Sequence, residues 1–308
     1  MDIRSLKIFC EVYRAKSFTL AARRLSLTQS AVSQQIKALE GELGIMLFDV
    51  DSRNMPTAAG EALYDEAIMI ISRMDDIPDL LQKTAGMASG HIKFGMIDVV
   101  ATALLPKVLT RFKTKNPGIG LEAVVKASRE LVEMINDFTL EFAVLVLNGL
   151  EDRFHTMSIY NDSIVAMLPP QWPGNDKAIK IKDLKGVPLI LYPPTSRTRS
   201  IIDDAFAMKG IHPAVGMEMH YPAAISALVR QGMGVGLISG LSATEVGEKG
   251  QKIAPIEELS GVRKIGVVCN PRRRPKPQTR FLIETISQMI SKKSAQHFFK
   301  TCDKKNER

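Results

Sequence analysis

The sequence predicts an α/β protein with three parts: an N-terminal all-α winged helix-turn-helix domain, a long linker helix and a two-lobed α/β domain. Three observations lead to this fold class. Two short helical patterns separated by a tight break lie within residues 17–43. A heptad pattern of apolar residues follows from residue 58. From residue 91 onward, strand-like and helix-like segments alternate, as is typical of α/β architecture.

The first part is expected to contain three helices. A helix over residues 3–15 would brace the other two. Ser17 is a suitable N-cap for a helix over 18–25, and Thr28 is a suitable N-cap for a helix over 29–43. The three- and four-residue spacing of one buried stripe is followed by Leu25, Val32, Ile36, Leu39 and Leu43. Two helices joined by such a short break form a helix-turn-helix.

The opposite face of the third helix is polar but mostly uncharged. Amide and hydroxyl groups can hydrogen-bond to base edges and phosphates, and a lysine can pair with a phosphate. An ordinary solvated helix pair gives the same pattern, so both interpretations remain open from these helices alone. The residues of this helix and its cap that we predict to contact double-stranded DNA are Thr28, Gln29, Ser30, Ser33, Gln34 and Lys37.

The run from Ser17 to Phe48 resembles the N-terminal domain of LysR-type transcriptional regulators. The matching positions form a long, gapless signature: Phe9, Val12, Ser17, Phe18, Ala21, Ala22, Leu25, Gln29, Ser30, Ala31, Val32, Ser33, Ile36, Leu39, Glu40, Leu43, Gly44, Leu47 and Phe48, continued by Arg53, Thr57 and Gly60. The resemblance implies a sequence-specific DNA-binding regulator of transcription. The chain length and the order of strands and helices extend the resemblance over nearly the whole chain.

Residues 45–57 are expected to form the wing, because they alternate loosely and contain residues that favour turns. The resemblance implies a basic residue where this chain has Val50, which is flanked by Asp49 and Asp51. This departure removes one phosphate contact and adds electrostatic repulsion. Arg53 remains as the predicted DNA contact of the wing.

A heptad seam begins after Ala58, with apolar residues spaced four, three, four, three and four apart. Its members are Leu63, Ala67, Ile70, Met74, Ile77 and Leu81. The seam predicts pairing of two chains, although a single amphipathic helix packed on its own domain has the same pattern. Two recognition helices would read an operator with two half-sites, which favours a homodimer or homotetramer. Pro78 is expected to kink or end the helix, and residues 83–90 to form a hinge.

The remaining chain predicts alternating strands and helices in largely parallel sheets. Strands are expected at 91–97, 120–125, 142–147, 163–168, 187–192, 235–239 and 265–269, and helices at 101–115, 129–137, 196–209, 223–231 and 279–290. These units are too many for one lobe, so we expect two lobes that surround a cleft, with crossings near 160–162 and 261–266. The resemblance implies an effector domain similar to periplasmic binding proteins.

These patterns define the expected domain boundaries. The DNA-binding domain is expected at 1–57, the linker helix and hinge at 58–90, and the effector-binding domain at 91–308. Within the effector-binding domain, lobe I is expected at about 91–161 and 267–292, lobe II at about 162–266, and a basic tail at 293–308. The net charge of +8 is concentrated near the C-terminus, while residues 1–60 hold only two more basic than acidic side chains. DNA binding is therefore inferred from the helix-turn-helix and not from the net charge.

Ligands of open α/β sheets lie at the carboxyl ends of strands, near helix N-termini. Residues 95–102 and 193–200 meet this condition. The second stretch has hydroxyls and guanidinium groups that suit a carboxylate, phosphate or sulfate; the alternative is plain N-capping by Ser196 with exposed arginines. The predicted ligand-binding residues are Asp98, Val99, Thr195, Ser196, Thr198, Arg199 and His220.

Two of these positions define the expected ligand. The resemblance implies Ser or Thr where this chain has Val99, seven residues before Pro106, so one end of the ligand is expected to be less polar. Asp98 can bind a hydroxyl or an ammonium group, or it can cap the following helix. The expected effector is a small organic anion with an apolar portion, such as a carboxylate.

Several function classes are disfavoured by the sequence. No run of about 18 apolar residues is present and charged residues interrupt the N-terminal segment, so we expect a cytoplasmic protein without a membrane span. Three scattered cysteines predict neither a metal site nor a disulfide framework. The sequence contains no Gly-x-Ser-x-Gly elbow, phosphate-binding loop or metal-binding helix motif, so we expect a protein that is not an enzyme and holds no cofactor. A cytoplasmic solute-binding protein or an enzyme without a DNA-regulatory role remains the alternative.

Overall fold

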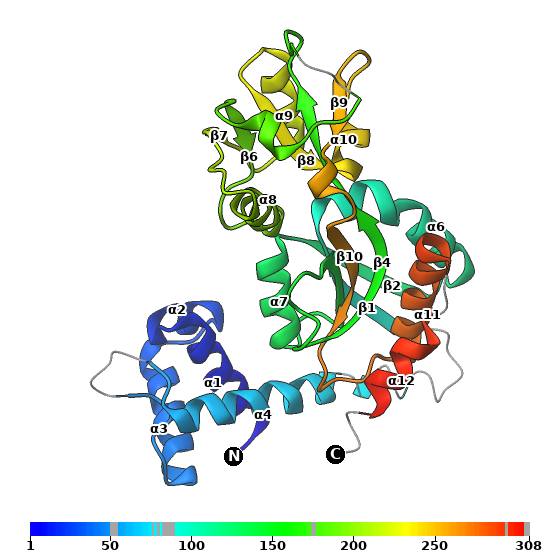
Figure 1. Ribbon diagram of the computed structural model, residues 1–308. Coiled ribbons are helices and arrows are strands. Elements are labelled where there is room, and N and C mark those ends of the chain that lie inside the picture. The colour runs from blue at the N-terminus through cyan, green and yellow to red at the C-terminus, as the bar shows by residue number, and fades with distance from the viewer. Residues whose placement is uncertain are drawn as a thin grey trace. The chain divides into compact units, whose positions relative to one another are not determined.

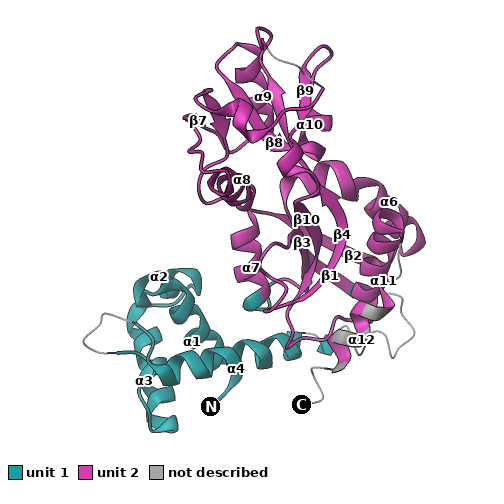
Figure 2. Cartoon of the chain, in the orientation of Figure 1, with its two compact units in different colours: residues 1–90, 136–139 teal, residues 91–135, 140–308 magenta. Residues whose placement is uncertain are grey.

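The structure is a computed structural model that describes residues 1–49, 55–75, 77–78, 81, 90–173, 177–292 and 295–304. The chain forms two compact units, as Figure 2 shows: residues 1–90 with 136–139, and residues 91–135 with 140–308. No described helix is both long enough and apolar enough to span a bilayer.

The first unit is helical and carries the predicted helix-turn-helix (Figure 1). Its helices are α1 (Ile3–Ala15), α2 (Phe18–Arg24), α3 (Gln29–Leu43) and α4 (Ala58–Asp75). The Ser17 hydroxyl accepts a hydrogen bond from the N–H of Leu20 at 3.2 Å, and the Thr28 hydroxyl accepts one from Ala31 at 3.2 Å. Gly44 ends α3 with a left-handed φ of 68°. The predicted caps are therefore confirmed.

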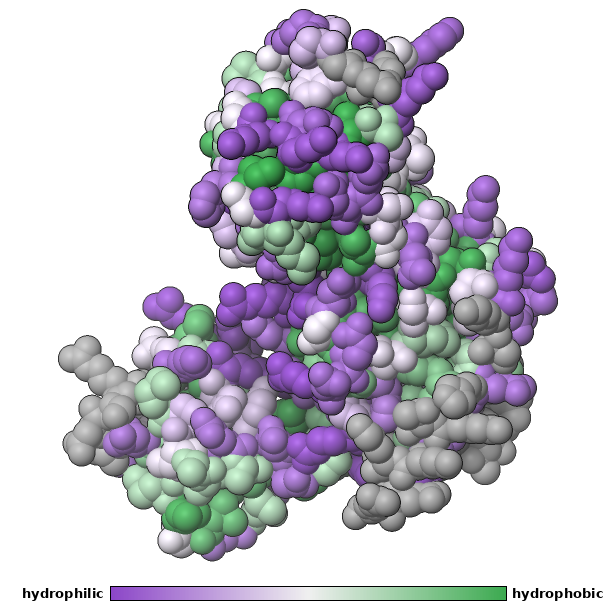
Figure 3. All heavy atoms as spheres, in the orientation of Figure 1, coloured by the Kyte–Doolittle hydropathy of each residue, from purple (hydrophilic) through white to green (hydrophobic). Residues whose placement is uncertain are grey.

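Most of the predicted apolar stripe is buried in this unit. Val32, Ile36 and Leu39 lie in its core, and Leu25 packs partly against it. Leu43 is 39% exposed, so its predicted burial is wrong. It lies on the last turn of α3, where the residues on either side of it are also exposed. Hydrophobic residues accordingly appear on the surface of this unit near the end of α3 (Figure 3).

The segment after α3 is tied to the helical core at both of its ends. The buried carboxylate of Glu40 accepts hydrogen bonds from the backbone N–H groups of Leu47 and Phe48 at 2.8 and 3.3 Å. Phe48 and Pro56 form an antiparallel bridge, as expected at the base of a wing. Val50 and Arg53 lie outside the described residues.

The side chains of the predicted heptad seam lie in two environments, one buried within the first unit and one exposed to solvent. Ala67 is fully buried in the core that α4 forms with α1, and Leu63 is partly buried against that core. Ile70, Met74 and Ile77 are 39%, 43% and 47% exposed. The prediction that Ala67 belongs to an intermolecular seam is therefore wrong, because its side chain is fully buried within its own unit, whereas Leu63 keeps part of its side chain exposed and its role stays a prediction. Residues 82–89, most of the predicted hinge, lie outside the described residues.

The second unit contains two five-stranded sheets. The first, which forms lobe I, has the order β2-β1-β3-β10-β4. Its strands are β1 (Gly90–Met96), β2 (Ile119–Val125), β3 (Phe142–Val146), β4 (His155–Asp162) and β10 (Arg263–Cys269). Its helices are the π-helix η1 (Val100–Leu104), α6 (Leu105–Lys115), α7 (Ser128–Asn136), α11 (Pro277–Ile286), the π-helix η4 (Ser287–Ser291) and α12 (Gln296–Lys304).

The second sheet, which forms lobe II, has the order β7-β6-β8-β5-β9. Its strands are β5 (Ile164–Leu168), β6 (Leu189–Leu191), β7 (Val215–Glu218), β8 (Val235–Ser239) and β9 (Lys252–Pro255). Its helices are η2 (Ile181–Leu184) and η3 (Glu257–Leu259), both 3₁₀, and α8 (Arg197–Met208), α9 (Pro222–Arg230) and α10 (Gly240–Val246).

Both sheets are mixed, which corrects the prediction of largely parallel sheets. β10 runs antiparallel to β3 and β4, and β5 runs antiparallel to β8 and β9. The chain crosses from the first sheet to the second at Ser163 and returns between residues 256 and 262. A strand that returns from the other lobe enters from the opposite end of the sheet, which explains the antiparallel direction of β10.

Candidate functional site

The residues predicted to contact DNA lie together on the solvent side of α3. Thr28, Gln29, Ser30, Gln34 and Lys37 are exposed and Ser33 is half-buried. The hydroxyls of Thr28 and Ser30 are 3.0 Å apart. The buried residues of α3 point the other way, into the core, so this polar face is available for a partner.

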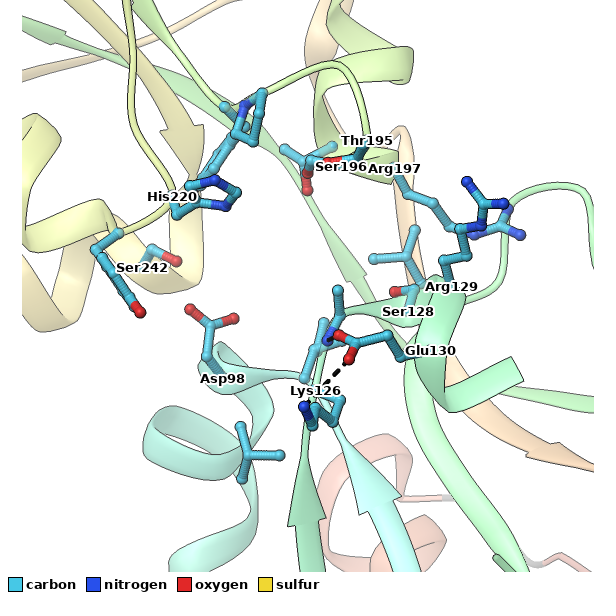
Figure 4. Close-up of a pocket in the computed structure, with 18 of the residues that line it drawn as sticks. Asp98, Lys126, Ser128, Arg129, Glu130, Thr195, Ser196, Arg197, His220 and Ser242 are labelled. Carbon is cyan, nitrogen blue, oxygen red and sulfur yellow. Dashed lines mark hydrogen bonds and ion pairs between the residues drawn. The ribbon is translucent and has the colours of Figure 1, made fainter. Parts of the chain in front are cut away.

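The second unit contains a cavity of about 510 Å³ between its two lobes. The end of β1, the start of α7, the β6–α8 connection and the starts of α9 and α10 contribute to its walls (Figure 4). Its polar lining residues are Asp98, Lys126, Ser128, Arg129, Glu130, Tyr192, Thr195, Ser196, Arg197, Thr198, His220, Tyr221, Ser242 and Arg263. A volume of this size suits a small-molecule ligand.

Five of the seven predicted ligand-binding residues line this cavity: Asp98, Thr195, Ser196, Thr198 and His220. Figure 4 shows the carboxylate of Asp98 and the hydroxyl of Ser196 directed into the same open space, with the His220 ring beside it. The structure therefore brings together side chains from stretches about 100 residues apart in the sequence.

The two other predicted residues do not line the cavity. Val99 is 3% exposed and lies in the hydrophobic core of lobe I. Arg199 is 8% exposed, and its guanidinium pairs with the carboxylates of Asp203 and Glu218, each at 2.8 Å. It also donates to the carbonyl of Tyr192 at 2.8 Å. The Arg199 guanidinium therefore fixes α8 to lobe II, and the prediction that it binds ligand is corrected.

The start of α8 presents unused polar groups to the cavity. Ser196 is the N-cap residue by position, but its hydroxyl makes no capping hydrogen bond. The first N–H groups of a helix have no acceptor within the helix, and the N-terminus carries a partial positive charge. Together with the hydroxyl of Ser196, these groups can hold an anion. The alternative that Ser196 acts only as a cap is not supported.

Most charged residues that line the cavity have a counter-charge. Lys126 and Glu130 form an ion pair at 3.1 Å, which is drawn in Figure 4. Arg263 pairs with the buried carboxylate of Asp162 at 2.7 Å and donates to the Thr198 hydroxyl at 3.1 Å. These pairs leave little free charge on that part of the wall.

Arg197 and Asp98 differ from these pairs. The Arg197 guanidinium donates to the backbone carbonyl of Asn148, and partial burial lowers its pKa from the usual value. The negative charge of Glu151 acts on Arg197 in the opposite direction to burial, although no ion pair joins them. Among the described residues, no donor or cation pairs with the Asp98 carboxylate. The carboxylate of Asp98 is therefore a charged group of the cavity wall that has no direct partner among the described residues.

Several cavity residues could not be predicted from the sequence. Tyr192 is nearly buried, and burial raises the pKa of its phenol to about 12, so it remains protonated at neutral pH. Arg263 reaches the cavity only because β10 returns beside β4. The only indication in the sequence that Arg263 has a special role is that this charged residue stands at the start of a buried strand. In the described part of the chain, no group of three or more His, Cys, Asp or Glu residues is arranged to hold a metal ion.

Comparison with protein families assigns both units. Residues 3–61 match the family model of the bacterial regulatory helix-turn-helix protein of the lysR family, and residues 85–291 match the LysR substrate binding domain. The chain belongs to the LysR family of transcriptional regulators. This assignment confirms the resemblance seen in the sequence. The proteins of this family are regulators and not enzymes, so the enzyme alternative has no support.

Relatives of this LysR regulator include the RuBisCO operon transcriptional regulator of Allochromatium vinosum, 27% identical over 78% of this chain and 80% of that protein. A probable RuBisCO transcriptional regulator of Cyanophora paradoxa is 26% identical over 95% of this chain and 93% of its own length.

Solved structures share the fold. The LysR family regulator CbnR has a TM-score of 0.62 at 22% identity, covering 94% of this chain and 99% of that chain. HinK from Pseudomonas aeruginosa has a TM-score of 0.59 at 22% identity, covering 95% and 99%. At these identities the similarity establishes the fold alone. The two-lobed effector domain and the N-terminal helix-turn-helix predicted for this chain are thus confirmed as a LysR regulator fold.

Proposed function

We propose that this LysR regulator binds a specific operator through α3 and changes its DNA binding when a small organic anion occupies the cavity between its lobes. The uncapped hydroxyl of Ser196 at the start of α8, facing the cavity, is the observation that carries the ligand half of this proposal. The domain roles would be DNA binding by residues 1–57, linkage and dimerisation by 58–90, and effector binding by 91–308.

The exposed side of α3 supports sequence-specific recognition. Gln29 and Gln34 can each hold an adenine edge through two hydrogen bonds, and Lys37 can pair with a phosphate. The hydroxyls of Ser30 and Ser33 can contact either a base or a phosphate. No acidic side chain belongs to this set, so the face does not repel DNA.

The exposed half of the α4 seam supports a homodimer, or a homotetramer built from dimers. Ile70 and Met74 of α4, and Ile77 beyond its end, are spaced four and three residues apart and remain exposed in the single chain. Covering these side chains with the same stripe of a second chain would remove apolar surface from water. Two α3 helices in such a dimer would reach two half-sites of one operator. One solved relative, CbnR, has been crystallised in a complex with its target DNA.

The cavity chemistry supports an organic anion. The hydroxyls of Thr195 and Ser196 and the N-terminus of α8 can hold a carboxylate. Ile97, Val125 and Val146 supply apolar wall for the rest of the molecule. A ligand that contacts both lobes would bind one arrangement of the lobes more tightly than another. Because of this difference in affinity, the bound ligand would shift the protein toward that arrangement and alter DNA binding.

The test measures both halves in one experiment. Fluorescence anisotropy would give the affinity of the full chain for its own upstream region and for a scrambled duplex, with and without an organic acid found by thermal shift. We expect specific binding and a change in DNA affinity with the acid. Linkage requires that DNA change the acid affinity by the same factor. Equal affinity for both duplexes would refute sequence-specific binding, and an unchanged affinity with bound acid would refute the regulatory role.

A further inference from the structure

We infer that the ligand of the interlobe cavity carries an ammonium group as well as a carboxylate, as an α-amino acid does, and that Asp98 binds the ammonium group. This inference rests on the proposed effector site and specifies its ligand class. It follows from the absence of a direct partner for the Asp98 carboxylate, from the position of Asp98 and from the chemistry of the opposite wall.

The charge pattern of the cavity distinguishes a zwitterion from a simple acid. Lys126 is neutralised by Glu130, and Arg263 is neutralised by Asp162. A simple carboxylate would use the start of α8 and leave the carboxylate of Asp98 in the same space, where like charges repel. A ligand with an ammonium group converts this repulsion into attraction.

No hydrogen bond or ion pair among the described residues uses the carboxylate of Asp98. Asp98 and Val99 are the first helical residues before the π-helix η1, and no side chain caps η1. The positive end of this helix favours the negative charge of Asp98 but leaves both carboxylate oxygens open to the cavity. The Thr102 hydroxyl donates to the main-chain carbonyl of Asp98 and not to its carboxylate. The residue is exposed in the cavity, and Figure 4 shows its carboxylate directed into the open space near Ser242 and His220.

The opposite wall provides the site for the carboxylate of the same ligand. Ser196 lies across the cavity from Asp98, and its hydroxyl points into it (Figure 4). The positive end of α8, a helix of 12 residues, begins there. The next residue, Arg197, adds a guanidinium that donates to a neutral carbonyl and keeps its charge. The subsite for the carboxylate of the ligand therefore lies on lobe II, and the subsite for its ammonium group lies on lobe I.

A ligand held in this way would join the lobes through its own two charges. Asp98 follows β1 in lobe I, and Ser196 precedes α8 in lobe II. A zwitterion contacts both, whereas the acid that lacks the amino group contacts only lobe II with its charge. The amino group would thus contribute to affinity and to closure of the lobes.

The experiment uses the full-length protein and pairs of probes that differ by the amino group alone. Thermal shift with the proteinogenic L-amino acids selects hits, and each hit is then compared by calorimetry with its own deaminated acid, for example L-phenylalanine with 3-phenylpropanoate and L-leucine with 4-methylpentanoate. We expect at least one amino acid to bind about tenfold or more tightly than its deaminated partner.

Asp98→Asn is the decisive variant. It should weaken binding of the selected amino acid by about tenfold or more and change the affinity for the deaminated acid by less than about threefold. Asp204→Asn, which removes an exposed carboxylate of α8 that does not line the cavity, is the matched control and should leave both affinities unchanged. Asp98 is exposed, so the melting temperature of the unliganded variant should equal that of the wild type.

The outcomes separate this inference from the proposed function. If the deaminated acid binds as tightly as the amino acid, or if Asp98→Asn retains full affinity for the amino acid, the zwitterion is wrong and an organic-anion sensor remains. If no amino acid binds but simple organic acids do, the same conclusion holds. If neither class binds and only inorganic sulfate stabilises the protein, both the zwitterion and the organic-anion proposal fail.

Discussion

Arg263 and Asp162 form a buried ion pair, with Nη1 2.7 Å from Oδ2 and side chains that are 5% and 3% exposed. Asp162 is the last residue of β4 and Arg263 is the first of β10, so the pair joins the two places where the chain passes between the lobes. The other oxygen of Asp162 accepts from the N–H of Leu241, and Arg263 also donates to Thr198. The pair thus connects the two segments that pass between the lobes to α8 and α10, which border the cavity.

Removing one partner of this pair should destabilise the effector unit strongly. Asp162→Ala leaves the guanidinium buried without a counter-charge, at a cost of about 3–5 kcal/mol. Urea unfolding followed by tryptophan fluorescence at Trp172 in lobe II would measure this loss. Glu130→Gln, which breaks the more exposed pair with Lys126, is the control and should cost less than about 1 kcal/mol. A loss below about 1 kcal/mol in Asp162→Ala would contradict the structural role of the pair.

Substitutions on the exposed side of α3 should reduce operator binding without unfolding the first unit. We expect Gln34→Ala to cost about 1–3 kcal/mol of specific affinity if the amide holds one base through two hydrogen bonds, and Ser33→Ala to reduce it as well. Anisotropy with the upstream duplex measures the loss. Gln35→Ala, exposed on another side of the same helix, serves as the control. Intact specific binding in both test variants would show that the recognition face is elsewhere.

The exposed half of the α4 seam should be required for self-association. Ile70→Asp combined with Met74→Asp places two charges on the stripe, which should dissociate the oligomer into single chains. Light scattering after size-exclusion chromatography measures the mass. Met208→Asp alters a side chain of α8 that is 85% exposed and should leave the mass unchanged. An unchanged mass in the double variant would remove the stripe from this role.

The seam also shows where sequence reasoning reached its limit. A heptad pattern identifies one face of a helix, but Ala67 and Ile70 belong to the same pattern and have different surroundings. Which of them faces α1 depends on tertiary packing that the spacing does not encode. The helix ends were easier to predict, because Ser17, Thr28 and Gly44 act locally through their own hydrogen bonds or backbone conformation.

The candidate ligand site was predictable only in part for the same reason. Asp98 and Ser196 were found because they follow a strand or precede a helix. Arg197 and Arg199 are two residues apart, about 200° around a helix, so only one of them can face the cavity. The sequence does not show which one does. Arg263 was missed because its position depends on long-range pairing of β10 with β4.

A ligand of the cavity should stabilise the protein through Ser196. At about 100 times its dissociation constant, it should add about 2.7 kcal/mol to the free energy of unfolding. Ser196→Ala should reduce this gain because a hydroxyl that faces the anion is lost, whereas Ser200→Ala, exposed one turn later on α8, should retain it. Thermal shift with each hit from the screen measures the difference. Equal stabilisation of both variants would place the anion away from Ser196.

The three cysteines should be unreactive in the folded protein. Cys10, Cys269 and Cys302 are buried, and burial raises the pKa of the Cys10 and Cys302 thiols to about 12 and that of Cys269 above its usual value. Thiol reagents attack the thiolate, which is scarce at pH 8 when the pKa is raised. We therefore expect Ellman's reagent to detect no rapid reaction in the native state and three thiols in guanidinium chloride.

The same raised pKa values determine how alkaline pH affects stability. Unfolded thiols ionise near their usual pKa of 9.0, whereas the folded thiols of Cys10 and Cys302 remain protonated up to a pKa of about 12. Between these values the folded state binds more protons, so the free energy of unfolding decreases as pH rises above about 9. A Cys10→Ala variant should lose part of this dependence in urea unfolding at pH 8 and 10.

Met208→Cys, which places a thiol at an exposed position of α8, is the control for reagent access in the thiol experiment and should react rapidly with Ellman's reagent at pH 8. If Ellman's reagent reacted rapidly with the native wild-type protein, the three thiols would not be shielded. The expected loss of stability at alkaline pH would then have no basis.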